Sequence, residues 1–590
     1  MALSDDPSLA VQPALPKDKS ASDEDLPRAK ERSNSQASSI SDVKSRAPLA
    51  DPDGEPPSVG AAFLQSLGLK KRAKVYDLDA VATQESVFDG PLAEHYTLHE
   101  KYENKEAFDP SFRWTYREDR AVTRKVDIKI MIWVLVMFLL LDIDRGNLKN
   151  ATADNLLKDI NITKGDYNLG NTLFKLGFLT AELPSQMIGK RIGVDIWLPL
   201  QICIFSILSG AQFWLNGRTS FLAFRFAIAF FQGGFIPDVI LYLSYFYTKN
   251  ALPLRLALFW SINFFADFLT AFLAVGLLKM RGVLGHAGWR WMFLIEGIIT
   301  LIGGIASFFM LAPSPSQTKT RWRPNGYFSD REVKIIVNRV VRDDPTKATM
   351  HNRQALNLSL LWKSLCDYDL WPLYVIGLTF GIAGYPLGNY FQLSMKELGF
   401  STVNANLLSV PHIVISIFNL ITLTLLSEAV NNRTWVSMIE NWWFLIFYIP
   451  LVVLKDPISP WVWFALATLV LGYPYSHAIQ VAWASRNAGS VRTRTVSASV
   501  YNMFVQVSGI IGANIYQAND APRYVKGNTI LLGIIALNLV VVYPGTFFYY
   551  KWRNAQKAKV WDKMTTEEKA HYLATTTDEG AKRLDFRFVY

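Results

Sequence analysis

Ionisable side chains inside long apolar segments are the residues of this sequence best suited to chemistry. Asp142, Asp144 and Arg145 lie together near the end of an apolar run that begins at Ile128. A charged group at membrane depth is costly, so its presence there indicates a functional role. A carboxylate beside an arginine can take up a proton when a substrate anion competes for the arginine. The alternative is an interfacial ion pair that only ends the helix.

Two further apolar runs carry a cation and a second polar residue on one helix face. Lys175 and Glu182 are seven residues apart, and so are Arg225 and Gln232, a spacing of about two helical turns. A buried lysine is either part of an anion site or the partner of a nearby acid, and the sequence leaves both open. An arginine fork suits a carboxylate or a sulfur or phosphorus oxyanion, unless the side chain snorkels to the interface.

The second half of the chain supplies neutral polar groups at the same depth, with almost no fixed charge. These are Asn389, Tyr390, Gln392, His412, His477, Gln480, Tyr501, Asn502 and Gln506. Asn389, Tyr390 and Asn502 are predicted substrate contacts, whereas the two histidines are predicted to be packing residues. In the first half Asp267 is ambiguous, and Glu296 is expected to form a structural pair with Arg290.

Membrane-spanning helices must position these residues. Apolar runs of about 18–25 residues, the length a helix needs to cross the hydrocarbon, recur from Ile128 onward. They predict twelve spans, at residues 128–147, 167–188, 196–215, 219–244, 254–279, 290–312, 370–392, 402–427, 435–454, 460–483, 494–516 and 528–549. We therefore expect an all-α membrane protein with two six-helix bundles, at 126–312 and 370–550, and a disordered tail at 1–125.

The charge of the loops predicts the orientation in the membrane. The polar stretch at 313–369 carries ten lysine and arginine residues, which makes it cytoplasmic by the positive-inside rule. An even number of spans then places both termini, including the tail at 551–590, in the cytoplasm. Thr163 and Ser401 precede the second and eighth spans at equivalent positions, which predicts two helix N-caps and an internal repeat.

Composition excludes several classes of protein. Half of the 590 residues are hydrophobic and only 19% are charged. The net charge of +10 fits cytoplasmic loops better than a nucleic-acid-binding face, so no nucleic acid is expected as a partner. Cys203 and Cys366 lie far apart, which excludes a disulfide scaffold and a zinc site.

The sequence also lacks the motifs of enzymes and of secreted proteins. There is no nucleotide-binding loop and no nucleophile–base arrangement, so we expect neither an enzyme nor ATP-driven transport, and no cofactor or metal. The first residues do not form a signal peptide. Asn150 and Asn161 lie in Asn-X-Thr sequences of the first predicted outside loop and are candidate glycosylation sites.

Several motifs along the predicted membrane region resemble one transporter family. They are Asp144-Arg145-Gly146-Asn147, Pro184-Ser185-Gln186, Gly288-Trp289-Arg290-Trp291 with Glu296-Gly297, Trp483-Ala484-Ser485-Arg486-Asn487 and Ala521-Pro522-Arg523-Tyr524. With them the chain resembles the major facilitator superfamily, and within it the fungal anion:cation symporters related to allantoate permease. The resemblance extends from about residue 128 to 550 and leaves out both tails.

This resemblance implies roles for individual residues. It implies a proton site at Asp144, substrate contacts at Arg145 and Arg225, and a second acid where this chain has Gln232. Because Gln232 cannot titrate, any second proton site would fall to Asp142 or Asp238. Lys175 is similar to a residue in the subgroup of fungal transporters for sulfate and other sulfur-containing anions.

The expected function is proton-coupled import of a small anion by alternating access. The expected partners are the anion, protons and the lipid bilayer, and the protein is expected to be a monomer in the plasma membrane. Two alternatives share the architecture: import of a carboxylate vitamin or an allantoate-like nutrient, and export of an acidic secondary metabolite.

Overall fold

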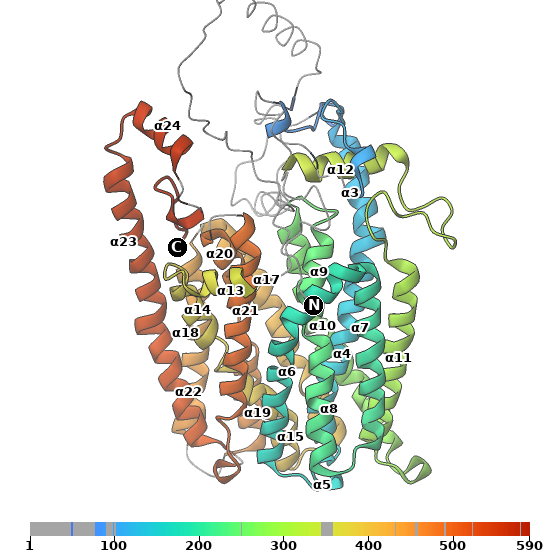
Figure 1. Cartoon of the computed structure of the whole chain (residues 1–590). Coiled ribbons are helices and arrows are strands. Elements are labelled where there is room, and N and C mark those ends of the chain that lie inside the picture. The colour runs from blue at the N-terminus through green and yellow to red at the C-terminus, as the bar shows by residue number, and fades with distance from the viewer. Residues whose placement is uncertain are drawn as a thin grey trace, which may run out of the picture. The chain divides into compact units, whose positions relative to one another are not determined.

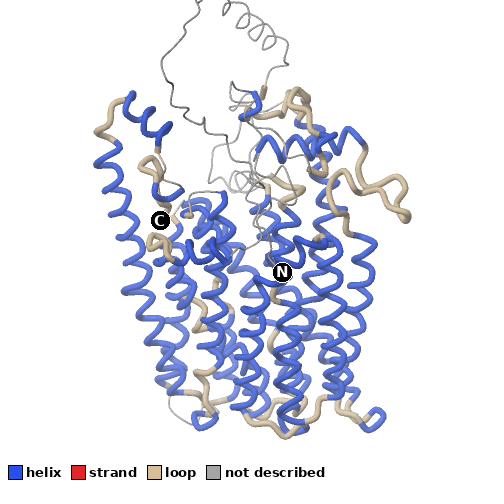
Figure 2. Tube along the Cα trace, viewed as in Figure 1, coloured by secondary structure: helices blue, strands red, loops and turns tan. Residues whose placement is uncertain are grey.

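The computed structural model describes residues 49–50, 77–89, 98, 102–248, 251–343, 358–430, 432–454, 458–488, 491–521, 523–576, 578 and 580–590. These residues fall into two compact units. The loop unit comprises the described residues of Met1–Ile132, Leu241–Leu252 and Ala312–Arg353. The membrane unit comprises those of Trp133–Ile240, Pro253–Leu311 and Gln354–Tyr590. Figure 2 shows helices and loops in both units, and the only strand-like pairings among the described residues are two isolated β-bridges.

The first half of the membrane unit is built mainly from long helices, with the short helices α5 and α9 between them (Figure 1). They are α4 (Ile132–Thr152), α5 (Leu156–Asp159), α6 (Lys164–Ile192), α7 (Val194–Ala211), α8 (Gly217–Gln232), α9 (Phe235–Leu243), α10 (Leu252–Leu277) and α11 (Gly288–Met310). Glycines allow two pairs of these helices to approach closely. A Cβ on Gly177 would lie 2.7 Å from the carbonyl oxygen of Phe226, and a Cβ on Gly297 would lie 2.6 Å from the nitrogen of Gly210. Helix α6 therefore packs tightly on α8, and α7 on α11.

The second half contains more and mostly shorter helices. They are α13 (Leu358–Leu365), α14 (Trp371–Thr379), α15 (Gly384–Glu397), α16 (Thr402–Leu407), α17 (Val410–Val430), α18 (Arg433–Val453), α19 (Pro460–Leu471), α20 (His477–Asn487), α21 (Val491–Ala513), α22 (Val525–Leu537), α23 (Tyr543–Trp561) and α24 (Thr566–Thr575). A short turn separates α14 from α15, and another separates α19 from α20. Both breaks fall inside predicted spans. They interrupt the regular backbone where polar side chains gather.

The all-helical membrane class predicted from the sequence is confirmed. By length and composition, seven helical segments of the described chain can cross a membrane: Val194–Trp214, Gly217–Leu243, Leu258–Met280, Gly288–Met310, Thr402–Ser427, Arg433–Val453 and Val525–Trp561. The other five predicted spans coincide with α4, α6, α14–α15, α19–α20 and α21, which carry polar residues or are interrupted by a turn. A binding site inside a membrane protein requires such polar side chains or exposed backbone groups.

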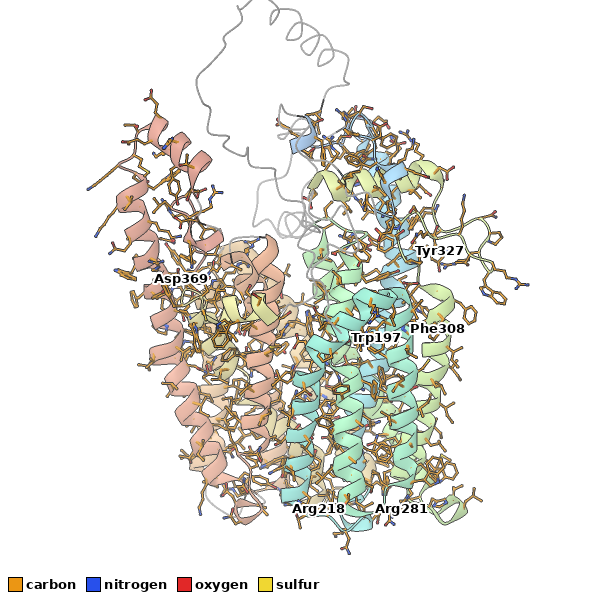
Figure 3. All side chains as sticks on the ribbon, viewed as in Figure 1. Trp197, Arg218, Arg281, Phe308, Tyr327 and Asp369 are labelled. Atoms are coloured by element: carbon orange, nitrogen blue, oxygen red, sulfur yellow. The ribbon has the colours of Figure 1, made fainter. Side chains whose placement is uncertain are left out.

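Local signals predicted from the sequence are also found. The Thr163 side chain accepts a hydrogen bond from the Asp166 nitrogen at the start of α6, and Ser401 accepts one from the Asn404 nitrogen at the start of α16. Both predicted N-caps are thus confirmed. In Figure 3, Arg218 and Arg281 lie at the same end of the membrane unit.

The loop unit joins the segment before α4 to the segment after α11. Helix α3 (Tyr116–Val126) begins with a capping box between Thr115 and Glu118, and ion pairs connect it to α12 (Asp330–Asp343). Lys125 Nζ lies 2.7 Å from a carboxylate oxygen of Glu332, and Arg331 Nε lies 2.7 Å from one of Glu118. Residues 102–126 are therefore ordered, which departs from the expectation of disorder up to residue 125; most of 1–101 lies outside the described residues.

Candidate functional site

Arg145, on α4, has two polar partners. Its Nη1 lies 3.3 Å from Oδ1 of Asp142, and its Nε donates to Oε1 of Gln232 at 3.1 Å. Its guanidinium carbon also lies 5.1 Å from the centre of the Phe178 ring. The pairing of Arg145 with Asp144 that their adjacency suggested does not form. Neighbours in a helix point about 100° apart, whereas residues three apart share a face, so Asp142 is the partner.

Arg225, on α8, is buried without an acidic partner in the described part of the chain. The guanidinium carbon of Arg225 lies 4.2 Å from the centre of the Phe174 ring, and Nη2 of Arg225 donates to Oδ1 of Asn171 at 3.5 Å. Gln232 is two turns further along the same helix, but its amide oxygen faces Arg145. Helix α8 thus lies so that Gln232 reaches α4, where its amide oxygen pairs with Arg145.

Lys175, on α6, lies against the second half of the membrane unit. Its Nζ is 5.1 Å from the centre of the Tyr385 ring of α15, and a Cβ on Gly509 of α21 would lie 2.9 Å from its Cε. No ion pair joins Lys175 to Glu182 among the described residues, although the sequence left that pairing open. Lys175 instead interacts electrostatically with Arg145 and Arg225, so the three predicted cations do share one region.

The cationic cluster, defined as Arg145, Lys175 and Arg225, has one carboxylate in contact. That carboxylate is Asp142, which also accepts a hydrogen bond from Asn263 at 3.2 Å. The formal charges of the cluster and Asp142 leave an excess of two positive charges. Buried charges without partners are costly, so this arrangement favours a negatively charged ligand. The rings of Phe174, Phe178 and Tyr385 add cation–π contacts that stabilise the cations while no anion is bound.

The predicted contacts from the second half form no hydrogen bond with the three cations in the described structure. Tyr390 donates its hydroxyl to Oδ1 of Asn168 at 2.6 Å, and the Asn389 carbonyl accepts a hydrogen bond from Tyr167 at 3.0 Å. Both residues therefore join α15 to α6. Asn502 is half-buried on α21, and in the described structure no hydrogen bond links it to the cationic cluster.

Asp144 and Glu296 are buried and unpaired. Neither carboxylate has a hydrogen-bond partner among the described residues. The expected Glu296–Arg290 pair does not form, because Arg290 donates to the carbonyl oxygens of Phe213 and Leu215. Glu296, six residues further along α11, faces the bundle interior.

The ambiguous Asp267 and the candidate Asp238 both have structural partners. Asp267 accepts a hydrogen bond from Lys149 Nζ at 2.5 Å. Asp238 accepts one from Ser185 Oγ at 2.8 Å, and Trp197 donates to the same hydroxyl. These contacts indicate that Asp238 connects α9 to α6 and α7.

Sequence reasoning missed Glu440, a fully buried acid on α18. One carboxylate oxygen accepts hydrogen bonds from the backbone nitrogen of Ser476, at 3.1 Å, and from its hydroxyl. Gln480 donates to the same hydroxyl at 2.6 Å and to the Tyr543 hydroxyl at 2.9 Å, while its oxygen accepts from Tyr501 at 2.5 Å. The sequence signal was present, since Glu440 lies inside the span predicted at 435–454.

The candidate glycosylation sites differ in exposure. Asn150 is only 1% exposed, and its oxygen accepts a hydrogen bond from Gln392 at 3.4 Å. A glycan on Asn150 would require this side chain to leave its buried position. Asn161 is exposed and has a positive φ of 58° in the connection before α6.

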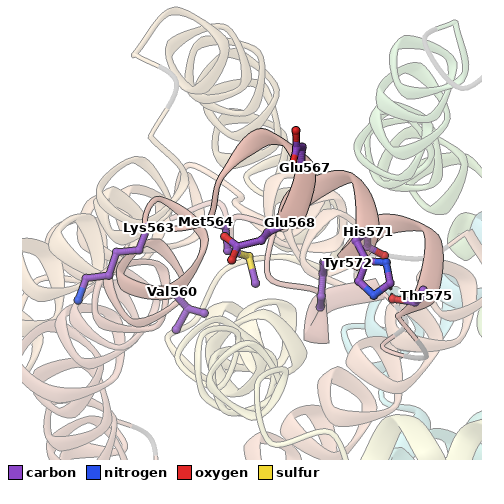
Figure 4. A pocket seen from close by; sticks show the side chains of 8 residues that line it. All are labelled: Val560, Lys563, Met564, Glu567, Glu568, His571, Tyr572 and Thr575. Atoms are coloured by element: carbon purple, nitrogen blue, oxygen red, sulfur yellow. Dashed lines mark hydrogen bonds between the residues drawn. The ribbon is translucent and has the colours of Figure 1, made fainter.

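A surface hollow near the end of the chain offers no comparable chemistry (Figure 4). It is lined by Val560, Lys563, Met564, Glu567, Glu568, His571, Tyr572 and Thr575. Glu568 caps α24 by accepting from the Thr565 nitrogen at 2.8 Å, and Tyr572 packs edge-on against Trp561. Within the described residues no group of three or more His, Cys, Asp or Glu side chains is arranged to hold a metal.

A bundle of apolar helices around buried cations defines the class of a multi-pass membrane transporter. The sequence model of the Major Facilitator Superfamily matches residues 134–513, and the chain belongs to this family. It is 41% identical over 491 residues to the uncharacterized transporter YIL166C of Saccharomyces cerevisiae, covering 83% of this chain and 90% of that protein. It is 25% identical over 463 residues to the MFS-type transporter cnsO of Penicillium expansum, covering 76% of this chain and 88% of that protein.

Solved structures share the fold. A bacterial homologue of the human lysosomal transporter Spinster, in an inward-facing and unoccupied conformation, matches with a TM-score of 0.53 and 15% identity. The match covers 74% of this chain and 97% of that one. The nucleoside transporter NupG matches with a TM-score of 0.52 and 8% identity, over 71% of this chain and 99% of that one.

Proposed function

We propose that the protein is a proton-coupled symporter that imports a small anion by alternating access. The preferred substrate is sulfate or another sulfur-containing or organic anion with two negative charges. The observation that carries this proposal is the cationic cluster, in which Lys175 and Arg225 have no acidic partner in the described structure and Arg145 is the one cation of the cluster that Asp142 contacts. A dianion would compensate the excess of two positive charges.

The contact between Asp142 and Arg145 suggests how proton and anion are coupled. A bound anion and the Asp142 carboxylate compete for the same guanidinium. A proton on Asp142 would remove its negative charge and leave Arg145 free to bind the anion. Asp144, the other predicted proton-coupling residue, lies on a different face of α4 and would hold a proton separately.

We further propose the finer placement that the sequence motifs suggest. The chain would belong to the anion:cation symporter branch related to allantoate permease. It would act as a monomer in the plasma membrane, with both termini in the cytoplasm and the bundles at 126–312 and 370–550.

Uptake into vesicles tests this function. Purified protein reconstituted into liposomes should accumulate labelled sulfate when the outside is more acidic than the inside. Unlabelled dianions should compete more strongly than monocarboxylates. Lys175→Gln should lower uptake of the dianion more than uptake of a monocarboxylate, because it removes one of the two excess charges. Uptake that ignores the pH gradient would contradict symport, and equal competition by neutral nucleosides would contradict an anion site.

A further inference from the structure

The interior of the first half contains a second charged layer, on a different face of α4 from the cationic cluster. Asp144 is 3% exposed and Glu296 is fully buried. All four of their carboxylate oxygens lack a hydrogen-bond partner among the described residues. A buried carboxylate without partners is among the most costly groups to keep ionised, so this layer needs its own explanation.

The packing of α4 against α11 brings these two acids together. The helices are antiparallel, with Leu140 against Gly303 and Trp133 Nε1 donating to Ser307 Oγ at 3.0 Å. The same register continues one to two turns further. There, Asp144 lies near Thr300 of α11, and Asn147 lies near Glu296. Asp144 and Glu296 are thus diagonal neighbours across one helix interface, and they interact electrostatically.

The surroundings of the pair provide hydroxyl and amide groups but no cation. The groups that face it are Asn147 from α4, Ser209 from α7 and Thr300 from α11. The nearby cations are engaged elsewhere: Arg145 with Asp142 and Gln232, Lys149 with Asp267, and Arg290 with backbone carbonyls. Cys203, the other titratable group of this interface, lies beside Gly304, two turns beyond Glu296.

Two carboxyl groups in one buried site cannot both be ionised without a compensating charge. The pair must therefore hold at least one proton. It also supplies the second proton-binding acid that Gln232 cannot provide.

We propose that Asp144 and Glu296 together form one buried proton-binding site, in which Glu296 is the second carboxyl. The bound proton lies on an oxygen of either acid and is released when the bundle admits water to the pair. The site deepens the proposed function, because it assigns the transported proton to this pair and leaves Asp142 to control Arg145.

A double-mutant cycle on purified protein tests the pair without measuring transport. Glu296→Gln and Asp144→Asn keep the shape of the protonated acids, so both variants should fold. At pH 8–9, Glu296→Gln should raise the melting temperature by about 2 °C or more in the wild-type background. In the Asp144→Asn background, Glu296→Gln should change the melting temperature much less, because the like charge of Asp144 is already absent. Glu440→Gln, which removes a buried acid far from the pair along the chain, should have the same effect in both backgrounds.

Uptake measurements separate this inference from the proposed function. In Glu296→Gln the pH of half-maximal uptake should move in the acid direction, since Asp144 no longer has a carboxylate neighbour. Additive effects of the two substitutions on the melting temperature would overturn the pair, even if uptake is proton-coupled. A non-additive cycle combined with pH-independent uptake would retain the pair and overturn symport. An unchanged midpoint with coupled uptake would show that the pair does not hold the transported proton.

Discussion

The two halves of the membrane unit differ in how they hold some of their buried charges. In the first half, Arg225, Asp144 and Glu296 are buried and Lys175 is half-buried, and none of the four has an oppositely charged partner in the described structure. In the second half, both carboxylate oxygens of Asp369 receive hydrogen bonds from Arg553 at 2.8 Å. A third comes from the Tyr549 hydroxyl at 2.7 Å. Glu440 has no cation as partner in the described structure, but one of its carboxylate oxygens accepts two hydrogen bonds from Ser476.

This difference indicates a division of labour. Charges without partners are free to respond to a ligand or a proton, whereas paired charges resist any change of protonation or position. The first half is thus suited to bind and titrate, and the second half to give a fixed surface against which it works. Tyr385, which lies under Lys175, is the clearest contribution of the second half to the cationic cluster.

The largest expected effect comes from breaking a paired charge. Arg553→Gln would leave Asp369, whose side chain is 2% exposed, buried without a cation. Loss of one partner of a buried pair costs about 3–5 kcal/mol. The variant should therefore show a much lower melting temperature and poor yield. Asp369→Asn combined with Arg553→Gln should recover part of the loss, and a single variant as stable as wild type would contradict this account.

Removing an unpaired charge should have the opposite pattern. Arg225→Gln should leave the melting temperature unchanged or higher, because no acid loses its partner. It should weaken anion uptake by about ten- to a hundredfold, the worth of a charge-assisted contact of about 1.5–3 kcal/mol. Labelled-anion uptake and thermal unfolding, measured on the same preparation, check the expected loss of uptake and the expected melting temperature. A destabilised variant would mean that Arg225 has a structural partner.

A new acid in the first half should alter binding in a pH-dependent way. Gln232→Glu places a carboxylate where the amide oxygen now accepts from Arg145 at 3.1 Å. The new charge would compete with the anion, so the apparent affinity at neutral pH should fall about tenfold, which corresponds to about 1.4 kcal/mol. Affinity should recover in acid, where the new carboxyl is protonated. Equal affinity at every pH would show that Gln232 and Arg145 do not meet during transport.

The comparison also shows what could be predicted from the sequence. Helix locations and the caps at Thr163 and Ser401 follow from local patterns, and they were predicted correctly. Lys175, Arg145 and Arg225 could each be selected as candidate site residues because ionisable residues at membrane depth are rare. The contact partners of these residues were harder to predict. Arg145 contacts Asp142 and Gln232, and the rotation of α4 and α8 about their own axes decides which side chains meet.

The second half was harder to predict for a related reason. Glu440 depends on Ser476, in the break before α20, which is 36 residues away along the chain. No periodicity in the sequence links a residue of one helix to a backbone nitrogen exposed by a break elsewhere. The hydrogen bonds of Asn389 and Tyr390 could not be predicted either, because the sequence does not show that α15 packs on α6 through these residues.

The smallest expected effect comes from an exposed pair in the loop unit, where burial no longer amplifies the interaction. The hydrogen bond from Arg331 is the main cause that lowers the pKa of Glu118 below its usual value, with help from the Thr115 cap. An acid with a lowered pKa stabilises the fold above the pKa of the unfolded chain, about 4.3. That contribution is lost as the pH falls through the folded value. The side chain of Arg331 is 56% exposed and that of Glu118 is 31% exposed, so the pair should contribute less than about 1 kcal/mol to the free energy of unfolding. Glu118→Gln should therefore lower the melting temperature slightly at pH 7 and not at about pH 3, with the difference reduced by salt. An equal loss at both pH values would assign the effect to the helix cap rather than to the charge.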